Sequence, residues 1–221
     1  MVRNFSRRVD VSSDETGFTL VELIVAMAVF AIFLTMLVAS VIGITRASSR
    51  AQLLTQSSSS VLAVFQNLDR QIRYANAINF PGTGASGARY VEFRTGADSS
   101  ASGVTTCTQW RFNPTTKTIQ SRQWQDVTGA VATAWSTKIT TVVDLGGATY
   151  PFQMIPAAVN GSAMQQLILS VSSGTDLTTP GAAISTTFVA RNSSIQSPSN
   201  SNVVVAGTSD TPVCLATGSR P

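Results

Sequence analysis

The chain has 221 residues, of which 43% are hydrophobic and 12% are charged, and its formal net charge is +4. It contains no histidine, which removes the commonest general base, the commonest metal ligand and the usual Ser or Cys catalytic triads. The length suits one domain with an appendage or two small domains.

The first predicted element is an apolar run from Phe18 to Ile44, preceded by a charged stub that ends at Gly17. As a helix with a rise of about 1.5 Å per residue, the run is about 40 Å long, enough to cross a hydrocarbon core of about 30 Å. It is longer than the apolar region of a secretory signal peptide and has no clear Ala-x-Ala cleavage site. We therefore predict a membrane-spanning helix, although a plain signal anchor has the same composition.

The arginines that flank this run predict its orientation. Three precede it and two follow it closely. This slight excess favours a cytoplasmic N-terminus and an exported C-terminal part by the positive-inside rule.

Glu22 is the only ionisable side chain in the apolar run. A carboxylate inside a membrane costs about 3 kcal/mol on insertion scales, so a nearby cation is expected. A cut between Gly17 and Phe18 would create an α-amino group one helical turn from Glu22 and on the same face. We therefore expect Glu22 to pair with the amine of its own helix or with that of a neighbouring helix.

The stretch from Gly17 to Glu22, GFTLVE, resembles the class III signal of type IV pilins and of the pseudopilins of type II secretion and competence systems. The resemblance implies that a prepilin peptidase removes the leader, residues 1–17, and methylates Phe18. It also implies that Glu22 docks each subunit to its neighbour in a helical filament. Major pilins of the family often carry a helix-kinking proline at the position of Ala39, so its absence favours a minor pilin or a pseudopilin.

The same resemblance implies the partners and the location of the protein. The partners are other pilin subunits, the prepilin peptidase, which is also the methylase, and an inner-membrane assembly platform with its ATPase. Residues 18–45 would hold the chain as a single-pass plasma-membrane protein with its head outside, and would then form the core of a surface filament. The sequence contains no Gly-rich phosphate loop, no metal-ligand cluster and no nucleophile elbow, so we expect no catalytic residue, no metal, no cofactor and no enzyme.

A second apolar pattern follows the membrane run. Its members are Leu54, Val61, Phe65, Leu68, Ile72 and Ala75. They lie 7, 4, 3, 4 and 3 residues apart, which makes one stripe at the helical period. We predict that the helix continues as an amphipathic segment over residues 46–78, and that its stripe packs against a globular head. Pro81 and Gly82 end the pattern.

Beyond residue 82 the apolar pattern changes to period 2, which is typical of strands. Residues 109–113 and 117–124 flank an Asn-Pro turn and predict a β-hairpin. Further predicted strands are 90–94, 139–145, 152–155, 167–171 and 184–190. We predict loops at 82–88, 96–106, 126–136 and 172–182. The fold class is therefore α+β, with a long helix packed on a mostly antiparallel head over residues 79–221, and with a polar tail from residue 192.

Two further segments of the chain carry a resemblance. The helix end at residues 68–75 and the predicted strand end at residues 187–192 resemble those of minor pilins and J-type pseudopilins. Both segments therefore favour a minor pilin or a J-type pseudopilin-like subunit.

Cys107 and Cys214 are the two cysteines of the chain. A bridge between them would tie the loop before the hairpin to the tail, and in the chain-entropy model it would stabilise the head by about 4 to 5 kcal/mol. Nothing else in the sequence holds the tail, so we favour the bridge over two free thiols.

The leading functional prediction is a minor structural subunit of a type IV pilus or related filament. The alternatives are a pseudopilin of a type II secretion system, a DNA-binding subunit of a competence pilus, and an anchored surface protein that never assembles. The DNA alternative depends on basic and aromatic residues that share the head, namely Arg89, Arg94, Arg111, Lys117, Arg122, Lys138, Tyr90, Trp110, Trp124, Trp135 and Tyr150. A mixed surface over core aromatics explains the same residues, and we favour that explanation.

Overall fold

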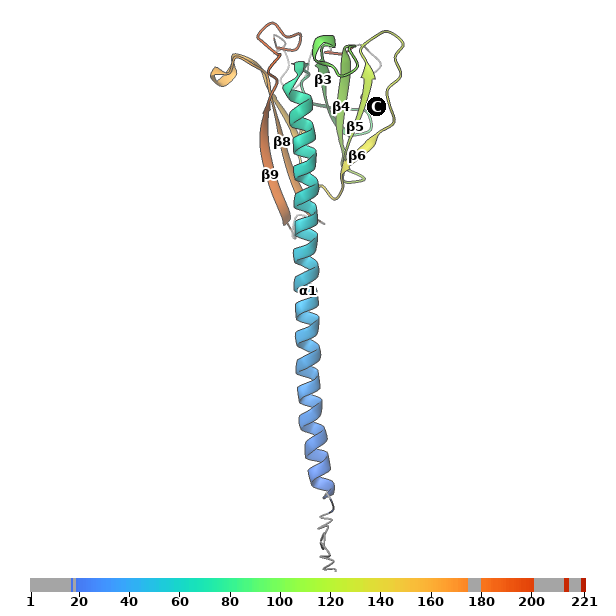
Figure 1. Cartoon of the computed structure of the whole chain (residues 1–221), viewed down its shortest axis with the longest axis vertical. Helices are drawn as coiled ribbons and strands as arrows, with labels where there is room; N and C mark the ends of the chain where they lie inside the picture. The colour runs from blue at the N-terminus through green and yellow to red at the C-terminus, as the bar shows by residue number, and fades with distance from the viewer. Residues whose placement is uncertain (1–16, 18, 175–179, 201–212, 215–219) are drawn as a thin grey trace, which may run out of the picture. The chain divides into compact units, whose positions relative to one another are not determined.

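A computed structural model of the chain describes residues 17, 19–174, 180–200, 213–214 and 220–221 (Figure 1). The chain divides into two compact units, Met1–Ala51 and Gln52–Pro221, which are described separately. The predicted α+β class is confirmed, because one long helix, α1 (Leu20–Arg73), precedes two antiparallel sheets.

In the first unit, α1 is apolar on all sides. Its described side chains from Leu20 to Ile44 are exposed, including bulky residues such as Leu23, Phe30 and Phe33. The stretch Leu20–Ser49 is long and apolar enough to cross a membrane, and it is the one such stretch among the described residues. A helix that is apolar all round is normally buried in a membrane or among other helices.

In the second unit, α1 has one buried face. Val61, Phe65, Leu68 and Ile72 are buried in the hydrophobic core, as the apolar stripe predicted. The side chain of Leu54 lies outside the described residues. Burial of this stripe, rather than the helical propensity of its serine-rich sequence, holds this part of the helix to the head.

The predicted end of the helix is wrong. α1 ends at Arg73, and strand β1 (Ala75–Ile78) occupies the last part of the predicted segment 46–78. β1 pairs antiparallel with β3 (Arg89–Thr95), and the amide of Ile78 donates to Oε1 of Gln165 at 2.8 Å. Ala75 fits the helical stripe and is also buried in the strand, so tertiary pairing decided between two local patterns.

The first sheet has the strand order β1-β3-β4-β5-β6, with β2 paired to β3. Its remaining strands are β2 (Gly82–Thr83), β4 (Thr106–Asn113), β5 (Thr118–Gln125) and β6 (Ser136–Ile139). The predicted hairpin is the pair β4–β5. Its turn forms because Oδ1 of Asn113 accepts hydrogen bonds from the amides of Thr115 and Thr116.

The predicted strand 139–145 is wrong beyond Ile139. Thr141 has a φ of 59°, which breaks the extended backbone. Val142 then makes an isolated bridge with Ser173, and the amide of Val143 donates to the carbonyl of Ser172 at 2.8 Å. This segment therefore crosses from the first sheet to the second.

The second sheet has the order β7-β8-β9 and consists of β7 (Phe152–Ile155), β8 (Gln166–Gly174) and β9 (Pro180–Val189). These are the positions of the last three predicted strands. All four predicted loops contain strand residues. β2 lies in 82–88, the first residues of β4 and β6 lie at the ends of 96–106 and 126–136, and the facing ends of β8 and β9 lie in 172–182. Short 3-10 helices occupy Ala97–Ser99 and Val159–Gly161.

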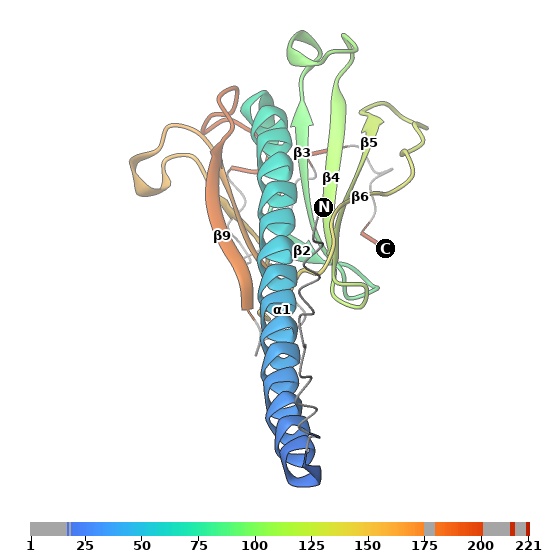
Figure 2. The ribbon, with the colours of Figure 1, turned by 60° about the horizontal axis from the view of Figure 1, so that its bottom comes forward.

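The head part of α1 contacts both sheets. Figures 1 and 2 show β9 on one side of this part of the helix and β3 to β6 on the other. The ring of Phe65 meets the ring of Phe188 of β9 edge-on, at 5.9 Å between centroids. Nε1 of Trp110 in β4 donates to Oε1 of Gln71 at 3.1 Å.

Candidate functional site

The predicted cleavage position lies directly before α1. Gly17 is exposed, and a Cβ added to it would meet no atom within 4 Å. Phe18 and leader residues 1–16 lie outside the described residues. The space around Gly17 is therefore open, among the described residues, to an approaching enzyme.

Thr19 caps the N-terminus of α1. Its Oγ1 accepts a hydrogen bond from the amide of Glu22 at 3.3 Å, and its carbonyl accepts one from the amide of Leu23 at 3.2 Å. This is the threonine half of a capping box, Thr-x-x-Glu. The sequence analysis missed the role of Thr19, although this spacing before an apolar run is a known helix-start signal.

Glu22 is the acidic residue in the first turn of α1. Its carboxylate there interacts favourably with the positive end of the helix dipole. Among the described residues Glu22 makes no ion pair. By contrast, the hydroxyls of Thr35 and Thr45 donate to carbonyls of their own helix at 2.7 and 2.8 Å. Glu22 is thus the group on this apolar surface that gains most from an external cation.

The described C-terminal residues lie on the first sheet. The structure joins Cys107 to Cys214, whose Cα atoms are 6.1 Å apart. Cys107 lies in β4 and not in the predicted loop before the hairpin. Val213 is buried beside the bridge. Asp126 and the two sulfurs lie within 4.8 Å of one another, but sulfurs bonded to each other are not available as thiolate metal ligands.

An ion pair attaches the tail a second time. Arg220 donates through Nη2 to Oε2 of Glu92 at 2.7 Å and through Nε to Oε1 at 3.0 Å. The side chain of Glu92 is only 5% exposed, and it also accepts from Gln109 at 2.7 Å and from Asn79 at 3.0 Å. The carboxylate is therefore both buried and well satisfied. The carbonyl of Pro221 accepts from the hydroxyl of Tyr90 at 2.7 Å, on the same sheet.

Several arginines of the DNA alternative are engaged within the head. Arg89 pairs with Asp144 at 2.7 Å, and Arg94 lies 3.8 Å from Asp126. The hydrogen bond from Arg89 holds the pKa of Asp144 below its ordinary value.

Two other arginines lie over one indole ring. The guanidinium carbons of Arg111 and Arg122 are 3.9 and 4.4 Å from the centroid of Trp135. Burial lowers the pKa of Arg122, and the charge of Arg111 lowers it further. Trp110 is fully buried in the core and Trp124 is almost so. These side chains therefore do not form a single open basic stripe.

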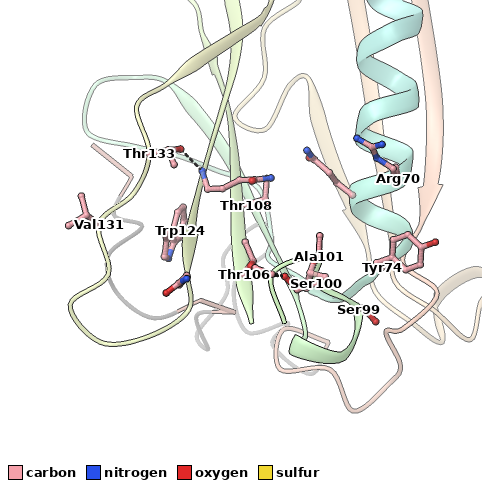
Figure 3. Close-up of a pocket in the computed structure, with 15 residues that line it drawn as sticks. Arg70, Tyr74, Ser99, Ser100, Ala101, Thr106, Thr108, Trp124, Val131 and Thr133 are labelled. Carbon is pink, nitrogen blue, oxygen red and sulfur yellow. Dashed lines mark hydrogen bonds between the residues drawn. The ribbon is translucent and has the colours of Figure 1, made fainter. Parts of the chain in front are cut away.

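A groove of about 780 Å³ opens between the last turn of α1 and strands β4 and β5. In Figure 3, Arg70 and Tyr74 stand on one side, Trp124, Val131 and Thr133 on the other, and Thr106 and Thr108 between them. The lining consists mostly of Ser, Thr and Gln and contains no carboxylate. The sequence analysis missed this groove, because its lining comes from stretches far apart in the chain.

Residues 12–42 match the family model of the prokaryotic N-terminal methylation motif. The comparisons with curated proteins and with solved structures found no match. The matched stretch contains Gly17, Glu22 and the exposed apolar start of α1. The chain therefore carries the class III signal and the apolar N-terminal helix of a type IV pilin-like or pseudopilin subunit.

Proposed function

We propose that the protein is a minor structural subunit of a type IV pilus or a related filament. One observation carries the proposal: a methylation motif leads directly into a capped helix whose apolar surface is covered by none of the residues that the structure describes. Such a surface needs a membrane or other apolar helices around it. A filament subunit uses the membrane before assembly and neighbouring helices after it.

The proposed processing prepares the helix for assembly. Hydrolysis between Gly17 and Phe18 removes the leader and frees the amine of Phe18, which is then methylated. The mature chain keeps Thr19, so the cap of α1 survives the cut. Glu22 then lies one turn from a cationic amine, and pairing with that of its own or a neighbouring subunit favours one axial register.

The head supports an extracytoplasmic location. A disulfide between Cys107 and Cys214 forms and persists in oxidising compartments, outside the cytosol. The partners would be other pilin subunits, the prepilin peptidase and an assembly platform with its ATPase. The subunit itself would contribute structure and no catalysis.

The mature N-terminus tests this proposal most directly. Mass spectrometry of the protein from the membrane or from sheared filaments should find a chain that begins at Phe18 and carries one added methyl group. The Gly17→Val variant should keep its leader, since a bulky residue at the cut obstructs the peptidase. A chain that begins at Met1, or an unmethylated one that begins anywhere other than Phe18, would remove the proposal.

A pseudopilin of a type II secretion system is the second candidate. α1 passes Ala39 without a break in its helix, and pseudopilins share the lack of a proline at this position with minor pilins. Deletion of the gene distinguishes the two. Loss of surface filaments with normal secretion supports a pilus, whereas loss of secreted proteins with normal piliation supports a secretion system.

A further inference from the structure

The groove beside α1 exists because one face of the first sheet changes character along its strands. Near β3, this face presents Val91, Phe93 and Trp110 to the core. Further along, the cross-strand pairs Thr108–Gln123 and Thr106–Gln125 occupy the same face. Directly opposed residues share a face, so these four side chains form one polar quartet. Burial of these polar groups in the apolar core would cost free energy. The quartet therefore stays outside the core and forms the floor of the groove.

The quartet has unused hydrogen-bonding capacity. Thr108 is 3% exposed, and among the described residues its hydroxyl makes no hydrogen bond. The side chain of Gln125 likewise makes none among them, although both residues line the groove. Among the described residues, Nε1 of Trp124, a further residue of the lining, is buried and makes no hydrogen bond. A buried donor without a partner is uncommon and favours a ligand that supplies an acceptor.

The rim of the groove is held in place by its own hydrogen bonds. The hydroxyl of Ser100 lies 3.0 Å from that of Ser102 and 3.1 Å from that of Thr106. Ser99 accepts from the side chain of Asn192 at 2.9 Å, which ties the rim to the segment after β9. This rim loses little conformational entropy on binding, which improves affinity.

The charge of the groove selects the sign of its ligand. Arg70 is the one charged residue among those that line it. Arg70 is exposed and, within the described part of the chain, forms no ion pair. A guanidinium binds carboxylate and sulfate in a bidentate manner. Tyr74, directly after the end of α1, is 48% exposed and offers an aromatic surface in the same groove.

We infer that the groove binds an acidic oligosaccharide, that is, a glycan that carries a carboxylate or a sulfate. Hydroxyl and carboxamide groups both donate and accept, so they match the ring hydroxyls of sugars. The ring of Tyr74 can cover an apolar sugar face, and Arg70 binds the acidic group. A volume of about 780 Å³ is within the range of small-molecule sites.

The geometry disfavours a peptide or a nucleic acid. The floor is the face of β4 and β5. β4 is paired on both edges, and the outer edge of β5 at Gln123 is bonded to Thr133, which disfavours addition of a peptide as a further strand. A nucleic acid needs several phosphate contacts, whereas Arg70 stands alone in the groove.

The test uses the full chain in detergent micelles on an array of oligosaccharides. The array pairs uronate, sialate and sulfate oligosaccharides with neutral counterparts of the same backbone, and it includes random peptides and single-stranded DNA. We expect binding to at least one acidic member of the array. Its neutral counterpart should bind at least about tenfold more weakly. Arg70→Ala should weaken binding about tenfold or more, and Thr108→Val about fivefold, because each removes a hydrogen bond to the ligand.

Arg73→Ala is the matched control. Arg73 lies one turn along α1, pairs with Asp69 and does not line the groove, so this variant should bind like wild type. The inference would be overturned if the protein bound no acidic glycan, if it bound neutral and acidic members equally, or if Arg70→Ala bound as tightly as wild type. So would binding to peptides or DNA that depends on Arg70, or loss of filaments in both groove variants. The mature N-terminus of these variants should be normal, which separates this result from a failure of the proposed filament role.

Discussion

Oγ1 of Thr19 accepts a hydrogen bond from the amide of Glu22 at 3.3 Å. Glu22 therefore takes part in the first turn of α1 through its backbone, and its side chain is the acid of the predicted docking pair. Two roles are therefore superimposed on Glu22. Its backbone belongs to a helix cap, which needs no charge, whereas its proposed docking role does need one. Substitutions at the two residues separate these roles.

Glu22→Gln tests the charge. Glutamine is also a capping-box residue, so the helix start should remain intact while the carboxylate is lost. We expect normal cleavage and methylation by mass spectrometry, but a filament yield at least tenfold lower in sheared fractions. Glu22→Asp, which keeps the charge, should retain part of the yield. A wild-type yield from Glu22→Gln would disprove the docking role.

Thr19→Val tests the cap. Valine is close to threonine in shape but has no hydroxyl to accept from the Glu22 amide, so the first turn should lose about 1 kcal/mol of stability. Hydrogen exchange of the full chain in micelles should show faster exchange at Glu22 and Leu23. Exchange near Thr35 should be unchanged and serves as the internal control. Equal exchange at Glu22 in both proteins would show that the cap does not operate.

Loss of the disulfide should destabilise the head. Replacing both Cys107 and Cys214 with Ser should lower the free energy of unfolding by about 2 to 5 kcal/mol, because the unfolded chain regains the entropy of a long loop. Urea unfolding followed by tryptophan fluorescence measures the change. Reductant should destabilise the wild type to the same level and leave the double variant unaffected. A wild type insensitive to reductant under unfolding conditions would contradict the bridge.

The buried pair Glu92–Arg220 should show strong coupling. Arg220→Met leaves the 5% exposed carboxylate of Glu92 without its cation, and we expect a loss of about 3 kcal/mol. Removing the acid as well, in Glu92→Gln with Arg220→Met, should restore part of that stability, since no unpaired charge remains. A double-mutant cycle in urea measures the coupling. Additive losses would mean that the two side chains act independently.

Acid stability should depend on Asp144. Its folded pKa lies below the ordinary value because Arg89 donates to the carboxylate, so its contribution is present above about pH 4 and is lost as the pH falls further. Because the pair is partly exposed, the contribution should be about 1 kcal/mol or less. Asp144→Asn should therefore weaken the decline in stability between about pH 5 and pH 3.

Asp98→Asn is the control for this pH dependence. Asp98 is exposed and, in the described part of the chain, forms no ion pair. Its stability profile should follow that of the wild type. If Asp144→Asn gives an unchanged acid profile in urea unfolding, the pair with Arg89 contributes nothing to folding.

Local patterns predicted the secondary structure well where burial and period agree. The hairpin β4–β5 was predicted because its strands alternate and because Asn113 starts a turn, both of which are short-range properties. The prediction failed where a pattern was compatible with two structures. Ala75 suits the helical stripe as well as β1, and the apolar residues after Ile139 suggest a strand that a positive φ at Thr141 interrupts.

The sequence by itself determined the processing signal, the apolar helix, the amphipathic stripe and most strands, because each is written in neighbouring residues or in a short period. Only the tertiary structure decided that α1 ends at Arg73, that Arg220 lies on Glu92, and that polar residues of β4 and β5 line a groove beside Arg70. These features depend on contacts between residues far apart in the chain, such as Glu92 and Arg220, which are 128 positions apart. Such contacts form only when the whole head buries its apolar surface, and no local pattern contains that information.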